Sequence, residues 1–251
     1  MPAMPMPMPM PMATDMVTVT DCSKASARLR LLQLVSPALP VGAFSYSEGL
    51  EWLVQTGRLA DGPALQQWLT AELAGGALPL VVAALAPLRT ALECWRQPGG
   101  ERPQEALRAL SELDGWLLAQ REAPELRAQQ RQMATSLLQL LADLGWPLPA
   151  PLPLAWPAAF AWAGLCLEIG SPELEEAYLY GWTANQISAA VRLVPLGPTE
   201  GQRLQLQLAP LIAERAAVLA EADPGALWTG GVGAGLAQLR HAELYSRLFR
   251  S

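Results

Sequence analysis

The side chains that most often carry enzyme chemistry are few and scattered in this sequence. There is one histidine, His241, and the three cysteines are Cys22, Cys94 and Cys166. Zinc and comparable transition-metal sites usually need several histidine or cysteine ligands at short spacing. The cysteines form no CxxC pair, so we expect no metal site and no disulfide framework, and we expect thiols that behave as small buried apolar groups.

Nucleophilic and acid–base catalysis find no better support. A Ser-His-Asp or Cys-His arrangement would have to use His241, but the GxSxG motif is absent. We therefore favour a hydrogen-bonding or partner-contact histidine, and a helical enzyme centred on His241 stays the weakest alternative. Glu48 and Glu51 lie three residues apart, as solvated or salt-bridged carboxylates on a helix face often do. We assign no catalytic residue.

Nucleotides and nucleic acids are also unsuited to this chain. GxxxxGK[ST] is absent, and the glycine-rich stretch 230–235 lacks GxGxxG spacing because Leu236 stands where the third glycine should be. We expect no cofactor. The formal net charge of -6 and the pI of about 4.9 disfavour contact with a phosphate backbone, so we expect no nucleic-acid partner.

The elements that must position any site are predicted to be helices throughout. Hydrophobic residues make up 51% of the 251 residues, with Leu and Ala favoured over β-branched residues. This length fits one large domain. We predict an all-α, single-domain multi-helix bundle over residues 23–251. Residues 1–22 form a Met/Pro-rich tail, whose alternating prolines predict disorder and exclude a signal peptide.

Capping signals and glycines predict several boundaries. Ser45 and Glu48 have capping-box spacing and predict a helix start, and Asp61 before Gly-Pro predicts another. The glycine-rich residues 223–235 predict a flexible linker. The linker leads to a docking segment, residues 236–251, with helical periodicity from Leu236 to Phe249.

Two uncharged stretches, residues 73–88 and 145–167, call for a comparison with membrane spans. The first is shorter than the roughly 20 residues that a span needs, and prolines interrupt the first half of the second. We interpret both as buried core and expect no membrane partner. The sparse, unpaired cysteines favour a reducing compartment, so we expect a cytoplasmic protein.

Three segments, taken together and in this order, closely resemble the UreF family of urease accessory proteins. They are LLQLVSPALPVGAFSYSEGLEW at 31–52, AAVRLVPLGPTEGQR at 189–203 and RHAELYSRLFRS at 240–251. The likeness extends from about Leu29 to the last residue. The family pattern has glycine where Ala43 stands and glutamate where Ala242 stands.

The resemblance implies an all-helical protein without enzyme activity of its own. It further implies assembly with the accessory protein UreD (also called UreH) and the GTPase UreG, in a complex that helps deliver nickel to the urease apoprotein in the cytoplasm. A homodimer within that complex is implied as well. Because this chain is poor in histidine and cysteine, its partners would have to hold the nickel.

Two segments are candidates for partner binding, one around residues 40–51 and one at residues 240–251. The second is rich in tyrosine, phenylalanine and arginine, which are enriched at interface hot spots. The simpler alternatives are that residues 40–51 only begin a capped helix and that residues 240–251 form a terminal helix packed on the core of this chain. The alternative function is a GTPase-activating or other direct regulator of UreG that uses Arg247 or Arg250. The candidate partner-binding residues are Pro40, Gly42, Ser45, Tyr46, Glu48, Glu51, Arg240, His241, Tyr245, Arg247, Phe249, Arg250 and Ser251.

Overall fold

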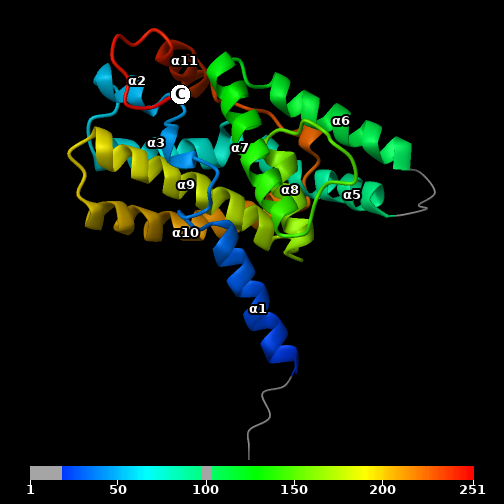
Figure 1. The fold of residues 1–251 in the computed structure, drawn as a ribbon. Coiled ribbons are helices and arrows are strands. Elements are labelled where there is room, and N and C mark those ends of the chain that lie inside the picture. Colours follow the sequence, from blue (N-terminus) through cyan, green and yellow to red (C-terminus); the bar gives the residue numbers. More distant parts are fainter. Residues whose placement is uncertain (1–18, 98–102) are drawn as a thin grey trace, which may run out of the picture.

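A computed structural model describes residues 19–97 and 103–251. Within those residues every regular element is a helix, which confirms the predicted all-α class (Figure 1). The elements are α1 (Val19–Leu34), η1 (Ala43–Ser45), α2 (Leu50–Gln55), α3 (Gly62–Gly75), α4 (Leu78–Ala83), α5 (Leu85–Arg96), α6 (Pro103–Ala119), α7 (Pro124–Asp143), α8 (Trp156–Cys166), α9 (Glu173–Leu193), α10 (Pro198–Ala220), η2 (Pro224–Ala226) and α11 (Val232–His241).

The core forms around α8, whose sequence WPAAFAWAGLC contains no charged residue. Nearly all of α8 is buried, and it packs against α5 and α7. Small residues allow close contact with the next helix, because a Cβ on Gly164 would lie 2.7 Å from Leu174 of α9. The long α9 and α10 run side by side, and α1 projects away from the rest (Figure 1).

One segment of the described chain, Leu78–Arg96, is long and apolar enough to cross a membrane by length and composition alone. Helices α4 and α5 occupy it, and 56% of its most apolar window is buried. Leu85, Leu88 and Leu92 are completely buried against other helices. The segment thus has the burial of a core helix, as expected for residues 73–88.

Several predicted boundaries need adjustment. The first helix begins at Val19, so it includes the last residues of the predicted tail 1–22, and the tail up to Thr18 lies outside the described residues. Asp61 caps α3 as predicted, since its carboxylate accepts the backbone N–H of Ala64 at 2.9 Å. The helix predicted from Leu236 to Phe249 is wrong at both ends, because α11 is Val232–His241.

The predicted linker 223–235 contains regular structure. It includes the turn η2 and the first residues of α11. Between them, the backbone N–H of Gly230 donates to the carbonyl of Gly75 at the end of α3. Its flexibility stays a prediction, but the helix that it leads to starts four residues earlier than the pattern of leucines indicated.

Candidate partner-binding site

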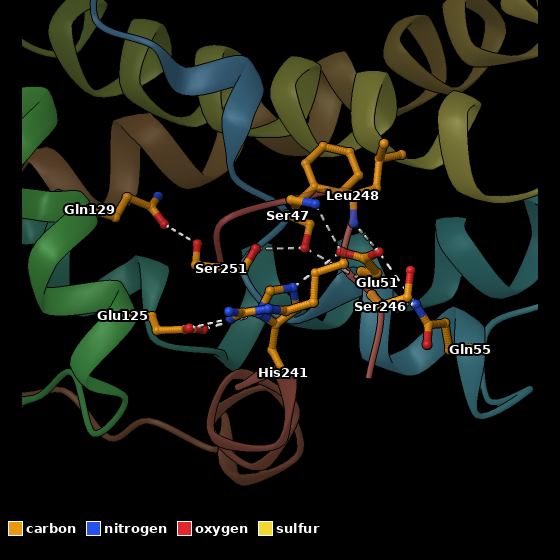
Figure 2. Close-up of polar contacts among 11 residues, drawn as sticks. Ser47, Glu51, Gln55, Glu125, Gln129, His241, Ser246, Leu248 and Ser251 are labelled. Atoms are coloured by element: carbon orange, nitrogen blue, oxygen red, sulfur yellow. Dashed lines mark hydrogen bonds and ion pairs between the residues drawn. The ribbon is translucent and has the colours of Figure 1, made fainter. Parts of the chain in front are cut away.

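The two segments singled out in the sequence lie together at one end of the molecule. Residues 242–251, here called the C-terminal strap, follow α11 and return across α2 (Figure 1). The loop 40–49 lies beside the strap, where Ser47 faces Ser251, and α7 supplies Gln129 (Figure 2). Helix α9 adds a hydrogen bond from Asn185 to the loop. Most of the candidate residues are thus brought into one neighbourhood, which only the tertiary fold creates.

The loop before α2 differs from the predicted capping-box helix. Ser45 ends the short turn η1, Tyr46 is extended, and α2 begins at Leu50. Glu48 and Gly49 both have positive φ, at 51° and 86°. A helix cannot continue through these left-handed residues. The helix start predicted at Ser45 is therefore wrong, and the Glu48 carboxylate instead accepts hydrogen bonds from Gln129 (2.7 Å) and Trp182 (3.0 Å).

Ser251 is bound tightly by this loop. Its backbone oxygen accepts from the N–H of Ser47 at 2.7 Å, from the N–H of Glu48 at 3.0 Å and from the Ser47 hydroxyl at 2.7 Å. Its own hydroxyl donates to Gln129 of α7 at 2.6 Å. The N–H of Arg250 donates to the carbonyl of Ser45. The strap is thus held through its backbone, which explains why it need not be helical.

Glu51 is the central acceptor of the site. Its side chain is 3% exposed, and its two oxygens receive the backbone N–H groups of Leu248 (2.7 Å) and Phe249 (3.0 Å). Gln55 of α2 donates to it at 3.3 Å, and His241 contacts it at 3.2 Å. One carboxylate therefore joins α2, α11 and the strap.

His241 is completely buried at the end of α11 (Figure 2). Its Nε2 lies 3.2 Å from Glu51 and its Nδ1 lies 3.1 Å from Glu125 of α7. Arg247 of the strap also pairs with Glu125. Partial burial raises the pKa of Glu125, but the hydrogen bonds from His241 and Arg247 outweigh it and hold that pKa below its usual value.

Apolar and aromatic contacts complete the attachment of the strap. Phe249 is buried, and the guanidinium of Arg192 lies over its ring at 4.5 Å. Arg192 also donates to the carbonyl of Phe44, and Asn185 donates to the carbonyl of Tyr46. The residues that the sequence analysis missed are Ser47, Gln55, Glu125, Gln129, Trp182, Asn185 and Arg192, and no local signal marks them because their partners are distant in sequence.

The candidate residues differ in how far they can reach a partner. Tyr46, Glu51, His241, Phe249 and Ser251 are buried, and they contact other parts of this chain. Gly42, Ser45 and Glu48 are half-buried. The exposed ones are Pro40, Arg240, Tyr245, Arg247 and Arg250. A direct partner contact stays a prediction for each of them, and the structure places the exposed five where such a contact needs no rearrangement.

Exposed apolar side chains recur along α11 and in the strap. Val232, Leu236 and Leu239 recur at helical spacing and are 81%, 42% and 38% exposed. Tyr245 and Leu248 of the strap are also exposed, and so is Trp228 before the helix. Large exposed apolar side chains gathered on one element are typical of an interaction surface.

A small hollow beside this surface contains a perturbed carboxyl group. It is lined by Glu48, Trp68, Glu72, Arg121 and Trp182, among others. Burial, reinforced by the nearby charge of Glu48, raises the pKa of Glu72 to about 7. Within the described residues no group of three or more His, Cys, Asp or Glu side chains could hold a metal ion. The hollow thus offers titratable groups without the ligand set of a metal centre.

Comparison with known proteins identifies the family. The family model UreF matches residues 59–209, which is more than half of the chain. The chain belongs to the UreF family. It is 39% identical over 234 residues to the urease accessory protein UreF of a Synechocystis species, covering 90% of this chain and 98% of that protein. It is 40% identical over 236 residues to UreF of Alkalilimnicola ehrlichii, covering 92% and 99% respectively.

The matched region and the candidate site overlap only in part. The UreF model covers the segment 189–203 but ends before the strap and begins after the loop 40–49. The alignments with the two UreF relatives named above cover 90% or more of the chain. The resemblance that was based on three short segments is therefore confirmed at the level of the family.

Proposed function

We propose that this chain is a urease accessory scaffold that assembles with UreD/UreH and the GTPase UreG and supports nickel insertion into the urease apoprotein in the cytoplasm. Membership of the UreF family makes it an accessory protein in urease maturation and not itself an enzyme. The more specific partners and the nickel step are the part proposed here. A homodimer is part of the same proposal.

One observation carries the assignment of the partner-binding surface. The exposed apolar and aromatic side chains of the last 20 residues lie on α11 and on the strap, which is itself attached by buried and partly buried hydrogen bonds. A surface held in place before binding loses little conformational entropy when a partner docks. Tyr245, which is fully exposed, has the character of an interface hot spot.

Copurification with UreD/UreH and UreG tests this proposal. The expected results are a stable complex with the full chain, loss of that complex when Arg247 to Ser251 are deleted, and failure of the deleted chain to support urease activation. Tyr245→Ala is expected to weaken binding by roughly 30-fold, the effect of a hot-spot residue worth about 2 kcal/mol. An intact complex with the deleted chain would contradict the assignment of the strap.

A matched control separates a specific contact from a general loss of exposed apolar surface. Leu206 is 75% exposed on α10, which lies on the other side of the molecule from the strap (Figure 1). Leu206→Ala is expected to leave UreD/UreH and UreG binding unchanged. Equal weakening by Tyr245→Ala and Leu206→Ala would indicate that Tyr245 has no special part in the interface.

Direct regulation of GTP hydrolysis is the alternative that the family comparison does not favour. Arg247 is engaged with Glu125, so its guanidinium would have to leave that carboxylate to enter a GTPase site. Arg250 is exposed, and Arg250→Ala is therefore the informative variant. We expect unchanged GTP turnover by UreG with this variant whenever the complex still forms.

A further inference from the structure

A neutral imidazole cannot donate a hydrogen bond to both of the carboxylates that contact His241. Both ring nitrogens face a carboxylate oxygen, at 3.1 Å in Glu125 and at 3.2 Å in Glu51. A neutral imidazole carries one N–H and one lone pair, so it can donate to only one of the two. The second contact needs either a second proton on the ring or a proton on one of the carboxyl groups.

Glu51 is poorly arranged to carry that proton. One of its oxygens accepts from the backbone of Leu248 and from Gln55, and the other accepts from the backbone of Phe249 and faces His241. These four contacts occupy the acceptor positions of a carboxylate. A proton on Oε1 would displace one of its N–H donors. A proton on Oε2 would have to lie in the hydrogen bond to His241, where the ring nitrogen is ordinarily the stronger base.

Glu125 is equally unsuited. One of its oxygens pairs with Arg247 and the other faces His241. Hydrogen bonds from these two side chains hold its pKa below the usual value, although partial burial opposes this shift. Since both carboxyl groups are then ionised, the second proton belongs on the ring.

We propose that His241 is an imidazolium in the folded protein, and that its second ring proton keeps the C-terminal strap bound to α2 and α7. Two carboxylates, Glu51 and Glu125, are then balanced by two cations, His241 and Arg247. Loss of the proton leaves a lone pair of the fully buried ring facing a carboxylate. The strap opens as pH rises, because the closed state binds one proton more than the open state.

The other charged groups around His241 do not supply a substitute for this proton. On α11 itself, Arg240 pairs with Glu243 at 2.6 Å on the exposed side of the helix. Ahead of α7, Glu122 approaches α11 near Gly235 and adds further negative charge. From α2 and α7 the only charged groups in contact with the ring are Glu51 and Glu125, among the residues that the structure describes.

The proposal goes beyond the proposed function and needs no partner for its test. Because His241 is the only histidine of the chain, imidazole ¹⁵N NMR of the full-length protein reports on this ring alone. We expect two protonated ring nitrogens at about pH 7.5, where most of a free histidine is neutral. A ring with a single N–H at that pH, in protein whose strap is docked, would overturn the proposal.

Hydrogen exchange measures how strongly the strap is held in its closed position. The amides of Leu248 and Phe249 are bound to Glu51, so their protection relative to an unfolded peptide at the same pH reports on strap closure. Between about pH 6 and about pH 9 we expect protection to fall by about 10-fold to 100-fold, which corresponds to the 1.5–3 kcal/mol of a charge-assisted hydrogen bond. Constant protection over this range would overturn the proposal.

Two variants identify the group that titrates. His241→Gln keeps one donor and one acceptor but does not ionise, so its strap should be less protected near pH 6 and should show no pH dependence. Glu243→Gln changes an exposed carboxylate of the strap that pairs with Arg240, and this variant should keep the full dependence. A His241→Gln variant that retains the wild-type pH profile of protection would contradict the proposal. If that variant does not fold, the NMR measurement on the wild-type chain tests the proposal alone.

Discussion

At the scale of single residues, burial decides which side chains bind other parts of this chain and which are exposed to a partner. Glu51, His241 and Ser251 were candidates for partner contact, and each is occupied by other groups of this chain. Tyr245 comes from the same short segment and is fully exposed. The distinction cannot be read from residue type, because tyrosine, histidine and glutamate are all common at interfaces and in buried networks alike. It depends on which way the strap turns after His241.

Glu72 provides a prediction about pH. Its folded-state pKa of about 7 exceeds its ordinary value of 4.5, so the folded state binds the proton more strongly than the unfolded state. Stability therefore falls as pH rises from about 4.5 to about 7. Glu72→Gln removes this effect and should raise the free energy of unfolding at about pH 8 by about 2–3 kcal/mol, with little change near pH 5.

Urea unfolding of both proteins at the two pH values checks this prediction. Glu112→Gln is the control, because Glu112 is an exposed carboxylate in a surface ion pair with Arg108. Its free energy of unfolding should follow the wild-type pH profile. Equal stability of wild type and Glu72→Gln at pH 8 would show that Glu72 is not destabilised by burial.

Asp114 provides a prediction about the core. This buried carboxylate on α6 accepts the backbone N–H of Ala155, just before α8, at 2.8 Å, and it pairs with Arg131 of α7 at 3.2 Å. Asp114→Ala leaves a buried N–H without its acceptor, and we expect a loss of about 2–4 kcal/mol in the free energy of unfolding. Glu112→Ala on the same helix should cost less than about 1 kcal/mol, and a similar cost for both would refute the role of Asp114.

At the scale of elements, local sequence signals predicted helix positions correctly where no distant segment of the chain binds the residues concerned. Asp61 caps α3 as its position before Gly-Pro predicted. The uncharged run after Trp156 became a buried helix, as its composition predicted. Ser45 and Glu48 do not form the predicted capping box, because residues about 200 positions away bind this loop. The backbone oxygen of Ser251 accepts hydrogen bonds from two of its N–H groups, and α11 packs on Gly49. Such distant contacts leave no trace in a local pattern.

Gly49 tests how strongly α11 fixes the start of α2. Its φ is +86°, and a Cβ at this position would lie 2.7 Å from the backbone nitrogen of Gln238 and 2.8 Å from the backbone of Ala237. Gly49→Ala therefore combines left-handed strain with a collision between backbones. We expect a loss of about 2–5 kcal/mol, measured by urea unfolding.

Gly57 offers a matched comparison for that substitution. It also has a positive φ, of +71°, but a Cβ there would meet open space. Gly57→Ala should cost only the left-handed conformation, about 1 kcal/mol. If both variants lost the same stability, the close packing of α11 on Gly49 would contribute nothing.

At the scale of the whole molecule, the sequence predicted the composition of the site and not its geometry. The all-α class followed from leucine and alanine content, and the family from three short segments, two of which contain the candidate residues. The meeting of those two segments depends on α7 and α9, which supply Glu125, Gln129, Trp182 and Arg192 to the loop and the strap. The site therefore assembles only when most of the helical core is already in place.

This order of dependence predicts what removal of Arg247 to Ser251 does to the remaining protein. The deleted residues contain no helix and bury one apolar side chain, Phe249, so the packing among the helices stays nearly complete without them. Far-UV circular dichroism should stay unchanged. Hydrogen exchange should become faster in α2 and α11, which lose the contacts through Glu51, and stay slow in α8 and α9. Loss of protection throughout the core would instead mean that the strap stabilises the whole fold, and loss of binding by the deleted chain could not then be assigned to a missing contact surface.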